Sequence, residues 1–155
     1  IKPKSINNEL IVNVDFAPTL LDLAGIKAPK DMQGESFKEQ LFDKKYVKRD
    51  AVYYHYYEYP FWHKVQPHYG VRTERYKLIH YYYNMNEWEL FDLDNDKDEL
   101  NNLYGTDGYS DITEDLKGKL KKLQSKYKDD MSLEEMRKMT DTRIKRVYTE
   151  MNSKK

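Results

Sequence analysis

Two histidines and an arginine carry the side chains best suited to hold an anionic substrate. His63, His68 and Arg72 lie close together in a segment rich in aromatic residues. A guanidinium can bind an oxyanion through two parallel hydrogen bonds, and imidazole nitrogens can exchange hydrogen bonds with hydroxyl groups. We therefore select these three residues as candidate substrate-binding residues. The alternative is that Arg72 only pairs with a neighbouring carboxylate.

Metal binding is not predicted anywhere in this chain. The histidines show neither the helical i, i+4 spacing nor the short-loop spacing of zinc sites. An acidic segment, Asp92 to Asp98, imitates the start of a calcium loop, but Lys97 replaces the required Gly and Leu103 the closing Glu. We expect this segment to be a turn that satisfies its own backbone, with Leu100 and Leu103 in the core.

No catalytic residue is predicted either. The chain has no cysteine, which excludes thiol catalysis, and it lacks a G-x-S-x-G motif and a P-loop. His55 and His80 lie inside expected strands, and we interpret both as structural. A formal net charge of zero argues against nucleic-acid binding, and no apolar run approaches the roughly 20 residues of a membrane helix.

The elements that position these residues form an α+β pattern. We predict four strands joined by short connections, which is typical of an antiparallel meander; they are 51–57, 69–72, 76–82 and 88–93. A long helix, 111–129, follows, with apolar residues at i, i+4, i+7 and i+11 that predict one buried stripe against the sheet. These apolar residues are Leu116, Leu120, Leu123 and Tyr127. A weaker amphipathic helix occupies the C-terminal tail.

The first part of the chain is expected to contain a short helix. Pro18 suits a first helical turn, Asp15 stands where a cap belongs, and Gly25 is a natural stop. A second brief helix is expected at 37–42. A charged segment, 43–50, marks the boundary, so we divide the chain into residues 1–45, a sheet-and-helix subdomain 46–131 and a helical tail 132–155.

Several motifs, in this order and spacing, resemble the C-terminal part of the sulfatases, which are sulfuric-ester hydrolases of the alkaline-phosphatase-like superfamily. They are V-D-F-A-P-T-L-L-D-L-A-G-I at 14–26, M-Q-G-E-S-F at 32–37, V-R-T at 71–73, R-Y-K-L-I at 75–79 and E-L-F-D-L at 89–93. The resemblance covers about Leu10 to Tyr127. One departure is Lys97, which replaces the proline that is usual in the acidic turn.

The resemblance implies that residues 1–45 are the end of the catalytic domain and that the loop before Arg72 faces the substrate. It also implies a parent enzyme that hydrolyses sulfate esters, with sulfated glycans as substrate. The family's nucleophile is a formylglycine made in a C/S-x-P-x-R motif, and its calcium is held by the N-terminal half. This chain lacks that motif and starts at Ile1 without Met, so we interpret it as a fragment that is inactive alone.

Three further expectations accompany this interpretation. The parent is expected in the periplasm or outside the cell by family resemblance. Without the catalytic domain, the helix Pro18–Ala24 would expose Leu20, Leu21 and Leu23, so we predict a homo-oligomer of the fragment. The alternatives are a fragment of a related phosphatase, phosphodiesterase or mutase, and a free-standing carbohydrate-binding module that uses Phe61 and Trp62.

Overall fold

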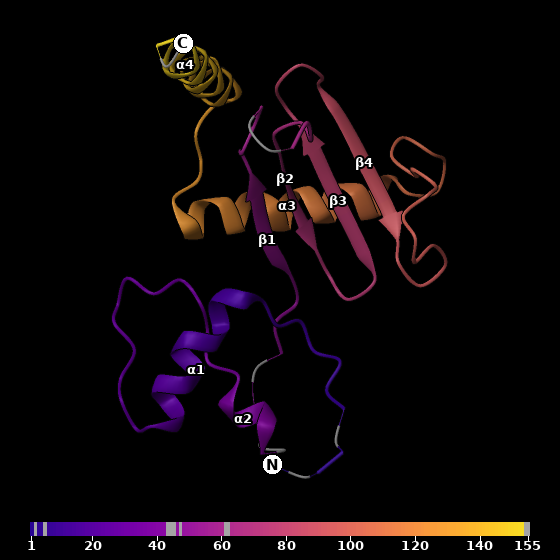
Figure 1. Cartoon of the computed structure of the whole chain (residues 1–155). Helices are drawn as coiled ribbons and strands as arrows, with labels where there is room; N and C mark the ends of the chain where they lie inside the picture. The colour runs from indigo at the N-terminus through magenta and orange to yellow at the C-terminus, as the bar shows by residue number, and fades with distance from the viewer. Residues whose placement is uncertain (2, 5, 43–45, 47, 61–62, 154–155) are drawn as a thin grey trace. The chain divides into compact units, whose positions relative to one another are not determined.

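The computed structural model describes residues 1, 3–4, 6–42, 46, 48–60 and 63–153. The chain divides into two compact units, Ile1–Val52 and Tyr53–Lys155. Figure 1 shows helices α1 and α2 in the first unit and the sheet with helices α3 and α4 in the second. Among the helices of the described residues, none is long and apolar enough to cross a membrane.

The first unit is organised around one buried carboxylate. Its elements are the 3-10 helix η1 (Asn13–Asp15), α1 (Phe16–Leu23) and α2 (Lys38–Leu41). Asp15 stands at the N-cap of α1, but its side chain makes no cap hydrogen bond. Instead its oxygens accept hydrogen bonds from Arg49, at 2.6 and 3.0 Å, and from the backbone N–H groups of Val12 and Glu35. Burial raises the pKa of Asp15, but these hydrogen bonds outweigh it and hold the pKa below its usual value.

Helix α1 ends where the sequence predicts and leaves much of its apolar surface uncovered. Gly25 follows it with a φ of 72°, a conformation that glycine adopts without steric cost. Phe16, Leu20 and Leu23 are 55%, 65% and 42% exposed. A helix of eight residues cannot persist on its own propensity, so this apolar face marks a surface that suits a partner.

The second unit confirms the predicted α+β fold. Its four strands lie in the order β1-β2-β3-β4, with β2–β3 and β3–β4 antiparallel. The strands are β1 (Val52–Tyr56), β2 (His68–Arg72), β3 (Tyr76–Tyr81) and β4 (Glu87–Asp92), within one residue of their predicted ends. Alternation along each strand gives the sheet two chemically different faces.

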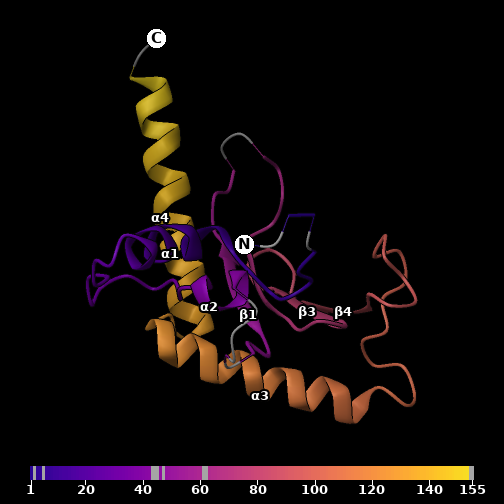
Figure 2. The same ribbon diagram turned by 90° about the horizontal axis from the view of Figure 1, so that it is seen from below.

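Helix α3 (Ser110–Tyr127) covers one of these faces and forms the core with it (Figures 1 and 2). Leu116 and Leu120 of its stripe are 1% and 3% exposed, as the periodicity predicts. They are buried in the same unit as Val71, Leu78 and Leu90, which are fully buried and aligned across three neighbouring strands. Burial of these five apolar side chains removes them from water and helps to stabilise the unit.

A polar cluster fastens the end of α3 to the first strand. Lys128 adopts a left-handed conformation with a φ of 58°, which ends the helix and turns Asp129 toward the sheet. The Asp129 carboxylate accepts a hydrogen bond from the Tyr53 hydroxyl at 2.6 Å and lies 2.7 Å from Nδ1 of His55. The other ring nitrogen of His55 lies 2.9 Å from the Tyr82 hydroxyl. His55 is therefore structural, as predicted.

Helix α4 (Leu133–Asn152) forms in the C-terminal tail, where the sequence predicts a helix. Ser132 and Glu135 form a capping box that satisfies donors at its start. Its attachment to the sheet includes three polar contacts. Tyr83 donates to Asp141, Arg137 donates to the carbonyl of Tyr82, and Arg143 donates to the carbonyl of Tyr57.

Candidate functional site

The face of the sheet opposite to α3 carries two of the three predicted site residues. Pairing of Gly70 with Ile79 and of Arg72 with Lys77 places these side chains on one face, and His68 shares it by alternation. We call this surface the His68 face and define it by its polar and aromatic members. These are Tyr54, Tyr56, His68, Arg72, Lys77 and Tyr81, with Gly70 between them.

His68 is held as a neutral hydrogen-bond acceptor. Its Nδ1 lies 2.8 Å from the backbone carbonyl of Gln66, so Nδ1 carries the proton that is donated there. The ring stacks on Tyr56 with a centroid distance of 5.4 Å and lies 5.1 Å from the ring of Tyr81. Burial lowers the pKa of His68. Nε2 therefore keeps a free lone pair near neutral pH, and no residue that the structure describes donates to it.

Arg72 is an exposed cation at the end of β2. Its guanidinium has no ion pair or hydrogen bond to any described residue, whereas Lys77, directly opposite on β3, binds Glu99 at 2.6 Å. The nearby Arg75 also has a partner, since it donates two hydrogen bonds to Asp92. Within the described part of the chain, no carboxylate pairs with Arg72.

Gly70 leaves the space that Tyr54 occupies. A Cβ atom at Gly70 would lie 2.4 Å from the Tyr54 hydroxyl and 2.6 Å from the carbonyl oxygen of Leu78. That hydroxyl is out of reach of solvent and has no hydrogen-bond partner among the described residues. Burial raises the pKa of Tyr54, so the hydroxyl keeps its proton and can donate.

The three predicted residues do not converge on one point. His68 and Arg72 lie four residues apart on a strand, which separates them by about 13 Å along β2. His63 is exposed in the loop before β2, and it has no hydrogen bond or ion pair with a described residue. Phe61 and Trp62 lie outside the described residues. The arrangement can contact separate groups of one extended ligand, with an anion at Arg72 and a hydroxyl donor at His68.

Comparison with known proteins identifies the family. The family model described as N-sulphoglucosamine sulphohydrolase, C-terminal, matches residues 1–126. The chain belongs to this sulfatase C-terminal family. Helix α4 lies beyond the matched residues of the sulfatase domain.

Relatives of this sulfatase domain include two proteins of Bacteroides thetaiotaomicron. An N-acetylglucosamine-6-O-sulfatase is 45% identical over 132 residues, which cover 83% of this chain and 24% of the relative. A Delta 4,5-hexuronate-2-O-sulfatase is 34% identical over 122 residues, covering 76% of this chain and 24% of the relative. The chain therefore spans about a quarter of the length of these relatives.

Solved structures agree with this assignment. A protein in complex with its substrate D-glucosamine-2-N,6-O-disulfate is 46% identical, with a TM-score of 0.74 over 79% of this chain and 25% of the other. The phosphonate monoester hydrolase of Agrobacterium radiobacter shares the fold alone, at 22% identity and a TM-score of 0.60 over 73% of this chain and 24% of the other.

The acidic turn of the sulfatase domain is structural. Asp92 is 1% exposed and binds Arg75, and the Arg75 hydrogen bonds lower the pKa of Asp92 to about 2. Asp96 accepts hydrogen bonds from the backbone N–H groups of Leu100 and Asn101. The prediction that Leu100 lies in the core is wrong, because it is 79% exposed. The turn directs the Leu100 side chain away from the sheet, while the next apolar residue, Leu103, donates its N–H to the carbonyl of Leu90 on β4.

His80 is a second structural histidine of the domain, as predicted. It is 2% exposed and stacks on Trp88 with a centroid distance of 4.1 Å and an interplanar angle of 4°. Its two ring nitrogens lie 2.7 Å from the Tyr69 hydroxyl and 2.8 Å from the side-chain oxygen of Asn86. Both nitrogens are thus occupied, which leaves none for a substrate or a metal ion.

Sequence reasoning missed the tyrosines of the His68 face. Tyr54, Tyr56 and Tyr81 orient His68 or fill the space beside it, but none was selected as a site residue. The sequence signal for these tyrosines is that side chains alternate between the two faces along β1, which places Tyr54 and Tyr56 on the same face. Pairing of β1 with β2 then brings that face to His68, and a pattern along one strand cannot reveal its neighbour.

Proposed function

We propose that this chain is the C-terminal part of a sulfuric-ester hydrolase that acts on sulfated glycans. In this proposal His68, Arg72 and His63 line the substrate pocket, while the nucleophile comes from the rest of the enzyme. The relatives support the substrate class, since two are sulfatases named for sugar units and a third binds a disulfated glucosamine as its substrate. The single observation that carries the assignment of the site is that the guanidinium of Arg72 has no ion pair or hydrogen bond with any residue that the structure describes.

The chemistry of Arg72 fits a sulfated sugar. An exposed Arg usually pairs with a carboxylate when one is near, and Lys77 opposite Arg72 does so with Glu99. Arg72 keeps its donors, and a planar fork of N–H groups matches two oxygens of a sulfate or carboxylate. His68 complements it, because a neutral imidazole with a free Nε2 accepts a hydrogen bond from a sugar hydroxyl.

The cofactors belong to the remainder of the enzyme in this proposal. Formylglycine is made from a cysteine or serine in a C/S-x-P-x-R motif, and this chain contains neither a cysteine nor such a motif. No group of three or more His, Asp or Glu side chains within the described residues is placed to hold a metal ion. The residues present therefore do not fit calcium or formylglycine, and the chain alone is expected to be inactive.

The catalytic domain of the parent is the proposed partner of the first unit. Residues 1–45 would be the end of that domain, and the apolar side chains of α1 would pack against its remainder. Phe16, Leu20 and Leu23 are exposed by 42% or more, which leaves a surface suited to such packing. The chain matches about a quarter of its relative's length, so the rest of that relative is long enough to contain such a domain.

The decisive experiment uses the whole enzyme with glucosamine-6-sulfate as substrate. Arg72→Gln is expected to lower kcat/KM by about 100-fold, since one desolvated charge contact is lost. Arg72→Lys should recover part of this activity, because lysine keeps the positive charge but lacks the planar pair of N–H donors of a guanidinium. Lys121→Gln, which removes an exposed cation on α3, is the matched control and should leave activity unchanged. Full activity of Arg72→Gln would contradict the proposed site.

A further inference from the structure

Two surface hollows meet at one arginine of α4. A hollow of about 530 Å³ lies where β1 ends and is lined by His55, Tyr56, Tyr57, Glu58 and Arg143. A second hollow, of about 460 Å³, lies along α4 and is lined by Glu135, Lys138, Met139, Thr142, Arg143 and Arg146. Arg143 lines both hollows, so they are neighbours on the surface. Of the residues that line these hollows, only Tyr56 also belongs to the His68 face, and α4 lies outside the family-matched residues.

Arg143 is held rigidly but keeps donors for a ligand. Its NH1 donates to the carbonyl oxygen of Tyr57 at 2.5 Å, and its guanidinium carbon lies 4.9 Å from the centroid of the Tyr57 ring. A guanidinium has five N–H donors, and this hydrogen bond uses one of them. The remaining donors are preorganised, because the stacked ring and the hydrogen bond fix the plane of the group.

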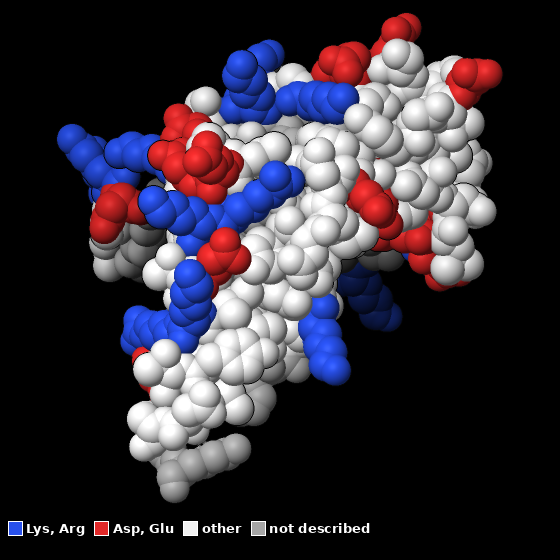
Figure 3. Space-filling model, turned by 90° about the horizontal axis from the view of Figure 1, so that it is seen from above, with Lys and Arg blue, Asp and Glu red and all other residues white. Residues whose placement is uncertain are grey.

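The charges that line the hollow on α4 favour an anion. Lys138 and Arg146 are exposed, and Lys138 has no ion pair with any residue in the described part of the chain. Arg146 pairs with Glu150 at 2.8 Å, but both partners are exposed, and such pairs are weak enough to exchange for another anion. Viewed from above, Lys and Arg side chains are interspersed with Asp and Glu side chains on this side of the molecule (Figure 3).

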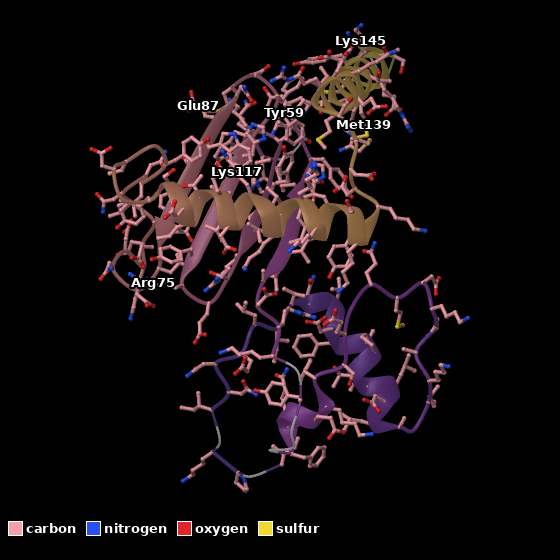
Figure 4. The ribbon with its side chains drawn as sticks, turned by 180° about the vertical axis from the view of Figure 1, so that it is seen from behind. Tyr59, Arg75, Glu87, Lys117, Met139 and Lys145 are labelled. Carbon is pink, nitrogen blue, oxygen red and sulfur yellow. The ribbon has the colours of Figure 1, made fainter. Side chains whose placement is uncertain are left out.

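Two carboxylates border the hollows and reduce this positive charge, but three cations and one carboxylate line the hollow on α4. Glu135 accepts hydrogen bonds from the N–H and the hydroxyl of Ser132, so it is occupied by the helix cap. Glu58 lines only the hollow at the end of β1. Figure 4 shows Met139 on the side of α4 nearer the sheet and Lys145 on the far side. Lys145 therefore does not contribute to the lining.

We propose that Lys138, Arg143 and Arg146, the α4 cationic surface, bind additional sulfated sugar units of a glycan chain. Lys138 and Arg146 lie eight residues apart, which is about 12 Å along the helix axis. A single sulfate cannot reach both, so the ligand must carry anions on successive units. This inference rests on the proposed function and deepens it: the enzyme would hold further sulfated units of an oligomeric or polymeric chain beyond the unit that it hydrolyses.

Binding of a heparin-derived octasaccharide to the 155-residue chain tests this inference by titration calorimetry at low salt. The double variant Lys138→Ala/Arg146→Ala is expected to bind about tenfold more weakly, and added salt should weaken the wild type in the same direction. The matched control is Lys121→Ala/Lys122→Ala on α3, which removes the same charge from exposed positions and should stay within about twofold of wild type. A fully desulfated octasaccharide should bind more than tenfold more weakly.

Three results would overturn the inference. They are unchanged affinity of the α4 double variant, an equal loss in the α3 control, or equal binding of the desulfated chain. Circular dichroism of each variant confirms that the helices are intact, and Arg143→Lys offers a second variant that keeps the charge and should lose about threefold. Arg72→Gln separates the two proposals. Octasaccharide binding that needs Arg72 but not α4 overturns only this inference, whereas full activity of that variant overturns only the proposed site.

Discussion

The hydroxyl of Tyr54 lies 2.4 Å from the position that a Cβ atom on Gly70 would take. Tyr54 is on β1 and Gly70 on β2, so the glycine allows a tyrosine of one strand to lie flat across its neighbour. The same position faces the carbonyl oxygen of Leu78 at 2.6 Å. The backbone of Leu78 and the hydroxyl end of the Tyr54 ring leave no room for even a methyl group at Gly70.

Gly70→Ala is therefore expected to destabilise the sheet. Overpacking of a tight site costs about 1–3 kcal/mol, and here the rigid Tyr54 ring or a strand must move. Gly118→Ala on α3 is the matched control, because a Cβ atom there meets nothing within 4 Å. Gly118→Ala should raise the unfolding free energy by about 0.5–1 kcal/mol, because alanine favours the helix more than glycine does. Urea unfolding of both variants checks the prediction, and equal changes in both would contradict it.

The Arg75–Asp92 pair predicts a specific loss of stability in acid. The pKa of Asp92 falls from 3.8 to about 2 in the folded state, with the Arg75 hydrogen bonds as the largest cause. A depressed pKa means that the folded state binds fewer protons than the unfolded state. The contribution of Asp92 is therefore complete above about pH 4 and is lost as the pH falls through 2.

Arg75→Gln isolates this contribution. The difference in unfolding free energy between wild type and variant should be constant from pH 7 to about pH 5 and shrink as the pH approaches 2. Other acidic groups titrate in the same range, but they are common to both proteins and cancel in the difference. Guanidinium unfolding at several pH values measures it, and a difference that grows in acid would refute the assignment.

Asp129 is expected to be a major stabilising residue although it lies just beyond a helix. Asp129→Ala removes partners from both Tyr53 and His55, which are fixed on β1. Because these hydrogen bonds are made to a charged, half-buried group, the variant is expected to lose about 2–4 kcal/mol of unfolding free energy. The exposed neighbour Asp130 gives the control, and Asp130→Ala should change stability by less than about 0.5 kcal/mol. Thermal unfolding that ranks the two variants equally would show that the cluster contributes little.

Self-association of the chain is predicted through the apolar face of α1. Leu20 is 65% exposed on that face beside Phe16 and Leu23. Leu20→Asp should shift sedimentation toward the monomer, because a buried carboxylate would oppose the contact. Leu100→Asp is the control, since Leu100 is 79% exposed in the acidic turn without that apolar neighbourhood. A wild-type chain that sediments strictly as a monomer would rule out the prediction.

The strands and the long helix could be predicted because their signals are local. Alternation along β3 and the apolar stripe of α3 depend on residues a few positions apart, and the structure confirms both elements. Gly25 likewise ends α1 for a reason contained in one residue. The error at Leu100 arose where the chain leaves this regularity, because a turn can direct an apolar side chain to either side.

By itself, the sequence determined the α+β fold, its four strands and the sulfatase resemblance, since each depends on residues near one another in the chain. The tertiary structure alone decided that Asp15 binds Arg49 rather than capping α1, that His55 reaches Asp129, and that Arg72 has no partner among the described residues. Contacts between residues distant in sequence depend on how strands and helices pack, and no local pattern specifies them.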